Sequence, residues 1–526
     1  MANPDADTAR SGTGAAPGSG ESPGADLVDS GADLVNPGAD LVDPRADLVN
    51  SGAGAVDPAG TSRRTLLTGA AATAAAAVAA QTAPAAASAG RGAAGDGRIA
   101  VQPPSRALRA LLREIDHRRI EATVRRLVAF GTRHTLSAQD DPERGIGAAR
   151  DWILARMREY AKASGGRMSV ELQSYVQEPG PRVPSPTRIS NVVATLRGTT
   201  SPDRIYVVSG HYDSRVSDVM DFTSDAPGAD DDASGVAVVM ELARVFATRR
   251  TGATLVFAAV AGEEQGLYGA AHLAERFKKR GADVQGMFTN DIVGSSTADD
   301  GTRDPHTVRL FAEGVPTSET PQEAEVRRSV GGENDSPARQ LARFVREVAD
   351  PEATGMTVRV VHRRDRYLRG GDHIPFLERA YPAARFTEPA EDYAHQHQDV
   401  RVENGKQYGD LPEFCDFPFT ARVARVNGAA LWSLAQAPGT PRGAKILTAA
   451  LTNDTELVWE RGSEPDLAGY EVVWRETTAT EWTHVIKVGD TTRHTVDLSK
   501  DNVFFGVRAV SRSGLRSPVA FPAPQR

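Results

Sequence analysis

The segment GADDDASG at residues 228–235 carries three consecutive carboxylates and leads directly into an apolar run. Carboxylates this close repel one another, and holding them against apolar residues is costly unless a cation offsets their charge. A solvated turn accounts for one or two of them, because Asp and Ser are favoured at helix N-termini. A metal site is the alternative, since dications such as zinc are bound by carboxylates together with imidazoles. Taken alone, the segment favours the turn.

Ionisable side chains also follow three apolar runs that are typical of buried strands. Ligand sites in parallel sheets lie beyond the carboxyl ends of the strands, so these side chains are expected to meet at one edge. An isolated His or Glu in such a place is commonly a solvated loop residue, whereas three strand ends together with the acidic triplet predict a metal site. The residues are His211 and Asp213 after the run 205–208, Glu263 and Glu264 after 254–260, and Asp291 after 284–289.

The segments between these runs have apolar residues at helical spacing. Short apolar runs that alternate with helices are typical of an α/β domain with a mostly parallel central sheet flanked by helices. We therefore expect an α/β domain over residues 100–436. The expected helices are one that runs from about residue 104 to Phe130, and further ones at 146–161, 236–247 and 270–278.

The order of the motifs resembles that of the secreted bacterial co-catalytic dinuclear zinc aminopeptidases, which are leucine aminopeptidase-like exopeptidases. The resemblance covers roughly residues 104–436. It implies a zinc exopeptidase-like fold and hydrolysis of the amino-terminal peptide bond of peptides that have a free N-terminus. The motifs are HYDS at 211–214, PGADDDASG at 227–235, AGEEQGLYGA at 261–270, the strand end at Asp291, GGDHIPF at 370–376 and HQHQD at 395–399.

The resemblance also implies a ligand set for two Zn²⁺ ions. Asp231, the middle residue of the triplet, would bridge the two ions. His211 and Asp291 would complete one site, and Glu264 and His395 would complete the other. A cis peptide bond after the bridging Asp is implied as well.

Further roles follow from the same resemblance. Glu263 resembles the general base, which takes a proton from the attacking water and passes it to the leaving amine. Asp213 is expected to accept a hydrogen bond from the imidazole two residues before it and to fix its orientation. In HQHQD the family's ligand lies four residues before an Asp, which selects His395 and leaves His397 as an accessory or surface residue. The family often has Ser where this chain has Gly371.

A linker rich in Pro and Gly at 436–441 precedes a region that has the pattern of a β-sandwich. The spacing of LVW, GYEVVW and FFGVRAV resembles a fibronectin type III domain, expected at 442–526. Such a module predicts contact with a cell surface or an extracellular polymer. The expected strands are 456–459, 469–474, 483–488, 493–498 and 503–510.

The N-terminal region is expected to lie outside the folded domains. Residues 1–61 hold a seven-residue repeat with Gly or Pro in nearly every unit, which predicts a disordered extension. Residues 62–89 begin with SRRTLL, continue as an uncharged Ala-rich stretch and end in ASA, which is the pattern of a twin-arginine signal peptide. The protein is therefore expected to be secreted, to an extracellular or periplasmic location, with no membrane span after the signal is removed.

Composition narrows the remaining alternatives. A net charge of −8 with interspersed acidic and basic residues predicts no nucleic-acid partner, and the single cysteine, Cys415, excludes an intrachain disulfide. A related zinc carboxypeptidase or glutaminyl cyclase has the same kind of ligand set and stays an alternative. A catalytically inactive surface binding protein of the same fold is disfavoured, because all the predicted ligands and the predicted base are present.

Overall fold

The computed structural model describes residues 97–98 and 102–526. The segments predicted to be a disordered extension (1–61) and a twin-arginine signal peptide (62–89) lie outside these residues. Ten α-helices are assigned in the described part, and none of them is long and apolar enough to cross a membrane. They are α1 (Arg106–Arg113), α2 (His117–Val128), α3 (Gly145–Lys162), α4 (Gly235–Ala247), α5 (Tyr268–Lys279), α6 (Pro321–Val330), α7 (Pro337–Val348), α8 (Pro351–Thr354), α9 (Ile374–Leu377) and α10 (Phe417–Gln436).

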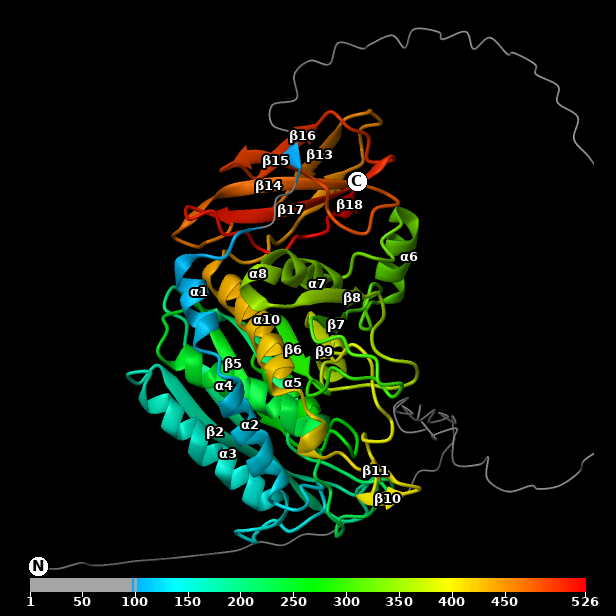
Figure 1. Ribbon diagram of the computed structural model, residues 1–526. Helices are drawn as coiled ribbons and strands as arrows, with labels where there is room; N and C mark the ends of the chain where they lie inside the picture. The colour runs from blue at the N-terminus through cyan, green and yellow to red at the C-terminus, as the bar shows by residue number, and fades with distance from the viewer. Residues whose placement is uncertain (1–96, 99–101) are drawn as a thin grey trace, which may run out of the picture. The chain divides into compact units, whose positions relative to one another are not determined.

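An eight-stranded sheet, in the order β2-β3-β5-β4-β6-β9-β7-β8, forms the centre of the α/β region (Figure 1). Its four middle strands, β5, β4, β6 and β9, are parallel, whereas β3 and β7 join this group in antiparallel pairings. The strands are β2 (Met168–Gln177), β3 (Thr187–Leu196), β4 (Ser201–His211), β5 (Ala253–Val260), β6 (Asp283–Asn290), β7 (Thr307–Phe311), β8 (Thr357–Val361) and β9 (Ala383–Thr387). The expected mixed α/β architecture with a mostly parallel centre is confirmed.

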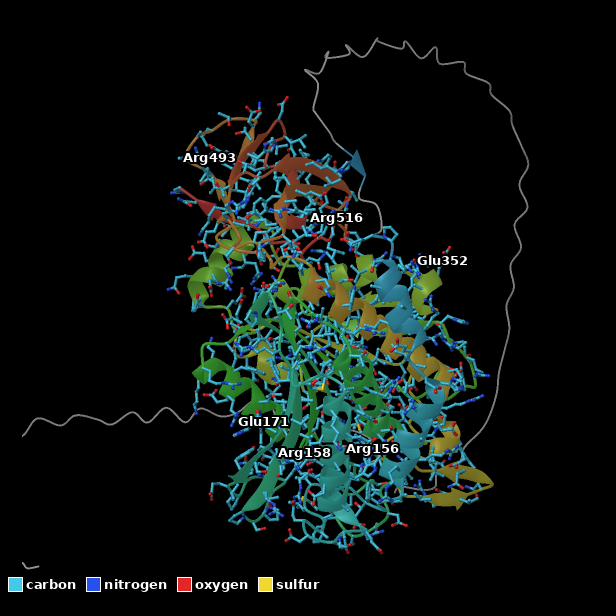
Figure 2. All side chains as sticks on the ribbon, turned by 90° about the vertical axis from the view of Figure 1, so that its left-hand side faces the viewer. Arg156, Arg158, Glu171, Glu352, Arg493 and Arg516 are labelled. Atoms are coloured by element: carbon cyan, nitrogen blue, oxygen red, sulfur yellow. The ribbon has the colours of Figure 1, made fainter. Side chains whose placement is uncertain are left out.

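Helices cover both faces of this sheet, and each face has its own apolar core. On β4, Tyr206 and Val208 belong to the larger core, which includes residues of α4, α7 and α10. Val207, between them, belongs to the smaller core with residues of α5 and α9. Because side chains alternate along a strand, a segment buried between two helical layers is continuously apolar, as residues 205–208 of β4 are. The surface carries charges of both signs, as Arg158 and Glu171 illustrate (Figure 2).

The single helix expected from about residue 104 to Phe130 is two helices. The chain leaves the helical path after α1, and Asp116 begins α2 by accepting a hydrogen bond from the backbone N–H of Arg118 at 2.9 Å. The N–H of Asp116 is itself bound by Glu241 of α4 at 2.9 Å. The prediction was wrong here because a helix N-cap and a long-range contact together outweigh a continuous helical pattern.

The C-terminal region forms two four-stranded sheets, in the orders β1-β15-β14-β17 and β16-β13-β12-β18. The five expected strands correspond to β13–β17. The strand β1 comes from before the α/β region and pairs with β15, which the sequence did not predict. The bounds are β1 (Gly97–Arg98), β12 (Lys445–Leu447), β13 (Thr455–Val458), β14 (Leu467–Glu476), β15 (His484–Gly489), β16 (Arg493–Val496), β17 (Val503–Ser511) and β18 (Ala523–Gln525). A separate ribbon is formed by β10 (Arg401–Glu403) and β11 (Lys406–Tyr408).

Candidate metal centre

Three neighbouring parallel strands deliver ionisable groups to one edge of the central sheet. His211 is the last residue of β4, Glu263 and Glu264 follow β5, and Asp291 directly follows β6. The acidic turn that holds Asp231 lies between β4 and α4 in the sequence. The strand ends predicted from the apolar runs therefore do meet at this edge.

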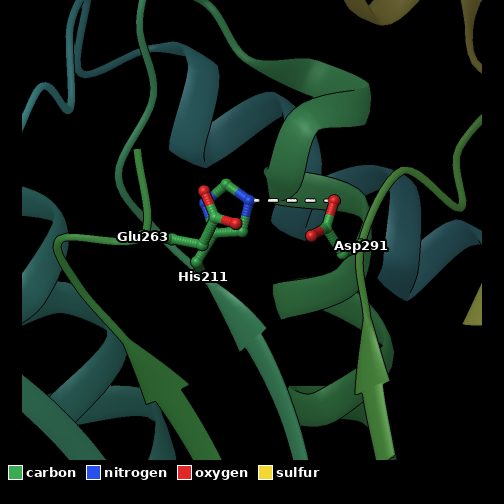
Figure 3. A group of neighbouring side chains, drawn as sticks. All are labelled: His211, Glu263 and Asp291. Carbon is green, nitrogen blue, oxygen red and sulfur yellow. Dashed lines mark ion pairs between the residues drawn. The ribbon is translucent and has the colours of Figure 1, made fainter. Parts of the chain in front are cut away.

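His211, Glu263 and Asp291 form a first group, in which one ligand atom of each residue lies within 4.8 Å of the others. Figure 3 shows the imidazole of His211 facing the carboxylate of Asp291. Nε2 of His211 lies 3.9 Å from Oδ1 of Asp291. That separation is too long for a hydrogen bond but within the span of two zinc–ligand bonds of about 2.0–2.2 Å each. His211 and Asp291 are buried, whereas Glu263 is partly exposed.

Asp231, Glu264 and His397 form a second group within the same limit. Nε2 of His397 lies 2.8 Å from Oδ2 of Asp231 and 3.1 Å from Oε1 of Glu264. The other oxygen of Asp231, Oδ1, lies 3.1 Å from Nε2 of His211. One oxygen of Asp231 thus faces each group, which is the arrangement expected of a bridging carboxylate.

The structure corrects the choice between the two histidines of HQHQD. His395 stacks on Phe414 with ring centroids 3.6 Å apart, and its Nδ1 lies 3.5 Å from Asp392. His397 has a left-handed backbone with φ of 55°, and its imidazole points to Asp231. The spacing argument took no account of this turn, which brings His397 and not His395 to Asp231. His397 therefore takes the place predicted for His395.

The outer members of the acidic triplet hold the turn in place. Asp232 accepts backbone hydrogen bonds from His211 and from Gly235, each at 2.9 Å. Asp230 accepts one from Gly294 at 2.6 Å. Asp410, which the sequence did not single out, accepts the N–H groups of Asp230 and Asp231 at 2.8 Å each. The peptide bond between Asp231 and Asp232 is cis, as expected.

Asp213 lies beside both groups and contacts each of them. Its carboxylate accepts the backbone N–H groups of Glu263 at 3.3 Å and Glu264 at 3.1 Å, and the hydroxyl of Thr135 at 3.0 Å. The Nδ1–H of His211 donates to the backbone carbonyl of Asp213 at 3.2 Å, while the carboxylate is 3.6 Å away. The residue therefore orients His211 mainly through its main chain. In the neutral imidazole with its proton on Nδ1, Nε2 would present its lone pair to the centre.

Burial and neighbouring charges move the pKa values of these acids in opposite directions. Burial raises the pKa of Glu263 well above its ordinary value. Burial also opposes the ionisation of Asp231, but His397 and His211 outweigh it and hold the pKa of that carboxyl well below its usual range. His397 and Arg215 likewise lower the pKa of Glu264 to about 2 against burial. Two acids of the second group are thus held as carboxylates, which is the form that binds metal ions.

The donor set fits a metal ion of the zinc type. Nε2 of His211, Nε2 of His397 and Oε1 of Glu264 are buried and find no hydrogen-bond partner among the described residues. Buried polar atoms without partners are costly, and a cation between them would satisfy them. Two imidazoles with three carboxylates match the ligands that zinc takes in proteins.

Two arginines at the centre were missed by the sequence analysis. Nε of Arg215 donates to Oε2 of Glu264 at 3.0 Å, and its Nη2 lies 2.5 Å from Nδ1 of His397. Nη2 of Arg385 donates to Oδ1 of Asp291 at 2.7 Å. No motif marks either residue, so only the three-dimensional structure brings them to the centre.

Comparison with known proteins places these residues in a wider context. The model of peptidase family M28 matches residues 191–403. A probable zinc metalloprotease of the fungus Leptosphaeria maculans is 58% identical over 425 residues, which cover 81% of this chain and 99% of that protein. A second, from Pyricularia oryzae, is 57% identical over 432 residues, or 81% of this chain and 86% of that protein. These relatives are fungal, whereas the motifs resemble a bacterial family.

Solved structures show a weaker likeness. The LapA aminopeptidase of Legionella pneumophila has 18% sequence identity and a TM-score of 0.44, over 64% of this chain and 78% of that one. At that level the structural likeness adds no argument beyond the relationship in sequence.

The alignment with the Leptosphaeria protein is longer than residues 100–436 and so extends beyond the α/β region.

Proposed function

The chain belongs to peptidase family M28, and on that premise we propose that it is a zinc aminopeptidase that hydrolyses the amino-terminal peptide bond of peptides. The observation that carries the proposal is the pair of ligand groups that meet at Asp231, with the partly exposed Glu263 beside them. The fungal relatives of this chain are named probable zinc metalloproteases, which supports zinc as the metal and peptides as the substrates.

We further propose that the centre holds two zinc ions. His211 and Asp291 would hold one, Glu264 and His397 the other, and Asp231 would contribute an oxygen to each. Zinc at these positions would polarise the peptide carbonyl and lower the pKa of a water molecule. The full burial of His211 at one end of the cluster and the partial exposure of His397 at the other leave the substrate an approach from the His397 side.

Glu263 is the proposed general base. It belongs to the first group, yet it is more exposed than the two ligands there, so a substrate can reach it. Its carboxylate takes a proton from the attacking water and returns it to the leaving amine. Burial raises the pKa of this carboxyl above its ordinary value, which favours a group that takes up a proton during the reaction.

Asp213 has the proposed role of a support for both functions. Its carboxylate binds the N–H groups of Glu263 and Glu264, so the base and a ligand are held by one acceptor. Its main chain binds the imidazole of His211. A single residue thus fixes the base relative to the two ligand groups, which favours a reproducible geometry for proton transfer.

The preference for a free amino terminus is supported by the motif AGEEQGLYGA at 261–270, which resembles the aminopeptidase branch. The purified chain is to be given a leucyl peptide and the N-acetylated form of the same peptide. We expect release of the first residue from the free peptide alone, loss of this activity with a chelator, and recovery with zinc. Cleavage at the carboxyl end would instead support a carboxypeptidase, and cyclisation of an N-terminal glutamine a glutaminyl cyclase. Zinc binding without any reaction would support a binding protein.

Export by the twin-arginine route is a separate proposal, which rests on residues 62–89. Fusion of residues 1–100 to green fluorescent protein, which fluoresces outside the cytoplasm only when it has been exported already folded, tests it. We expect export of the fusion, and retention when Arg63 and Arg64 are both replaced by Lys. Export of both fusions alike would contradict the proposal. Attachment through a fibronectin type III-like module at 442–526 likewise stays a proposal.

A further inference from the structure

We propose that Arg385 is a positioning residue of the metal centre, and that the chain has glycine at position 371 because the guanidinium of Arg385 occupies the space that a side chain there would need. The inference deepens the proposed function and rests on it for the ligand role of Asp291. The two residues lie on different elements, since Arg385 is in β9 and Gly371 is in the loop before α9.

Arg385 fixes the orientation of the Asp291 carboxylate. The strand β9 pairs in parallel with β6, and this pairing places Arg385 beside the strand end that carries Asp291. Its side chain is fully buried, and Nη2 donates to Oδ1 at 2.7 Å and to the backbone carbonyl of Asp291 at 3.3 Å. The same Oδ1 lies 3.9 Å from Nε2 of His211 (Figure 3). The hydrogen bond therefore holds the carboxylate at a separation from the imidazole that an ion can span.

The guanidinium is held from behind as well. Nη1 donates to the backbone carbonyl of Gly370 at 2.8 Å and lies 3.5 Å from Oδ2 of the buried Asp365. Asp365 also pairs with Arg366, which in turn contacts Glu391 at 3.4 Å. Both terminal nitrogens of the guanidinium are thus engaged, so a shift of this group would break contacts of a buried charge, which is costly.

Gly371 leaves the room that this arrangement needs. A Cβ atom on residue 371 would lie 2.8 Å from Nη1 of Arg385 and 3.2 Å from Oδ2 of Asp291. The first distance is shorter than real contacts allow, so either the guanidinium or the loop must shift. Because Arg385 is pinned by Gly370 and Asp365, the shift would disturb its bond to Asp291. The absence of a side chain at position 371 thus has a physical reason.

The test compares zinc binding by variants of the purified chain. Gly371→Ala pushes the guanidinium away without removing any group, and Arg385→Gln removes the guanidinium. Replacement of a residue that hydrogen-bonds to a metal ligand typically weakens metal affinity by about 10- to 100-fold. We expect both variants to bind one of the two zinc equivalents at least about tenfold more weakly than the parent chain, measured by competition with a chelating dye.

A control variant separates positioning from packing. Arg508→Gln removes another buried guanidinium, which lies in β17 and is paired with Glu471 of β14 and with Glu347 of α7. It should lower the urea midpoint of unfolding and leave zinc affinity unchanged.

The double variant Gly371→Ala/Arg385→Gln gives the sharpest outcome. If Gly371 acts by admitting Arg385, the added methyl group should matter several-fold less once the guanidinium is gone. Full additivity, an unchanged zinc affinity in both single variants, or a tighter affinity would each overturn the proposal. If Arg385→Gln does not fold, Arg385→Lys and Gly371→Ala carry the same comparison. Because the readout is zinc binding, a chain that binds zinc but cuts no peptide would refute the proposed aminopeptidase activity and leave this inference standing.

Discussion

Asp231 is the residue on which the centre depends, because its two oxygens face two different histidines. Oδ1 lies 3.1 Å from His211 and Oδ2 lies 2.8 Å from His397. The other two acids of the triplet instead stabilise the turn, which is the alternative role that the sequence suggested. Asp230 and Asp232 accept backbone hydrogen bonds and hold the turn. The metal-site and turn interpretations of GADDDASG are therefore both needed, each for different residues of the triplet.

The two histidines of HQHQD give a matched pair of variants. His397→Gln removes an imidazole that lies 2.8 Å from Asp231, so we expect loss of one zinc equivalent and a fall in kcat of at least about 100-fold. His395→Gln removes a ring that stacks on Phe414 and should keep zinc content and kcat within about threefold of the parent chain. Metal analysis and peptide kinetics on the same samples decide between them. The opposite pattern would restore His395 as the ligand.

Replacement of Glu263, the proposed general base, tests the catalytic chemistry while the proposed metal ligands are retained. Glu263→Gln keeps the size of the side chain but cannot accept the proton, so kcat should fall by about 100- to 10,000-fold. Zinc content should stay at the parent value, because the ligands that we propose are all retained. Activity close to that of the parent would exclude Glu263 as the base, whereas loss of zinc would make it a ligand instead.

Because His373 is buried, we expect the free energy of unfolding to depend on pH. Burial lowers its pKa to about 4, against an ordinary 6.5, although Asp365 opposes this shift. The unfolded chain therefore takes up a proton near pH 6.5, while the folded chain does so only near pH 4. The contribution of neutral His373 is complete above pH 6.5 and is lost as the pH falls toward 4, on the order of 3 kcal/mol over that window.

The variant His373→Gln isolates this effect. Nε2 of His373 lies 2.8 Å from the backbone carbonyl of Arg364, and a glutamine amide can donate to the same acceptor. Urea unfolding of both proteins with a chelator, at pH 7.5 and pH 4.5, removes the contribution of the metal. We expect the parent chain to lose more free energy of unfolding than the variant. Equal losses would mean that His373 is not held neutral.

The end of β4 packs closely against the start of α4 at Gly210, the residue directly before His211. A Cβ atom on Gly210 would lie 2.5 Å from the backbone carbon of Gly235, the first residue of α4. The added Cβ would be bonded directly to the main chain, and the atom it meets is a main-chain carbon. No side-chain rotation can therefore relieve the clash. The strand and the helix can approach one another only because residue 210 has no side chain.

Gly210→Ala should therefore separate β4 from α4. Overpacking of a well-packed interior typically costs about 1–3 kcal/mol, and relief here requires movement of the backbone. We expect a loss of at least that size in the urea unfolding of the metal-free protein, together with weaker zinc binding, because His211 follows directly. A variant as stable as its parent would show that the two elements can move apart freely.

Buried ion pairs connect the α/β region to the C-terminal strands. Asp335, just before α7, is fully buried and pairs with Arg343 of α7 and with Arg475 of β14, at 2.7 Å each. Removal of one partner from a buried ion pair leaves an uncompensated charge. This carboxylate therefore links two parts of the chain that the sequence suggested as separate domains.

Asp335→Asn should lower the free energy of unfolding by about 3–5 kcal/mol, since it leaves two buried guanidinium groups without a counter-charge. The control is Asp490→Asn, which breaks the exposed pair with Arg461 at 2.7 Å and should cost less than about 1 kcal/mol. Urea unfolding of both variants measures the difference. If the two cost the same, the buried pair contributes no more than a surface one.

Much of this arrangement follows from local pattern. Continuous apolar runs predict buried strands, and parallel strands deliver the residues that follow them to one edge of the sheet. The sequence alone therefore places His211, Glu264 and Asp291 together. The helices that flank the sheet follow from the period of their apolar residues in the same way. These features depend on neighbours in the sequence, which is why the sequence is enough to predict them.

What the tertiary structure decided depends on contacts between distant residues. The choice of His397 over His395 rests on one left-handed backbone residue and on a ring stacked against Phe414. Arg385 is one of 61 basic residues, and nothing near it in the sequence points to Asp291 or Gly371. A residue type and its spacing indicate which chemistry a chain can perform, but which side chain reaches the centre is set by packing, and packing energies are summed over the whole fold.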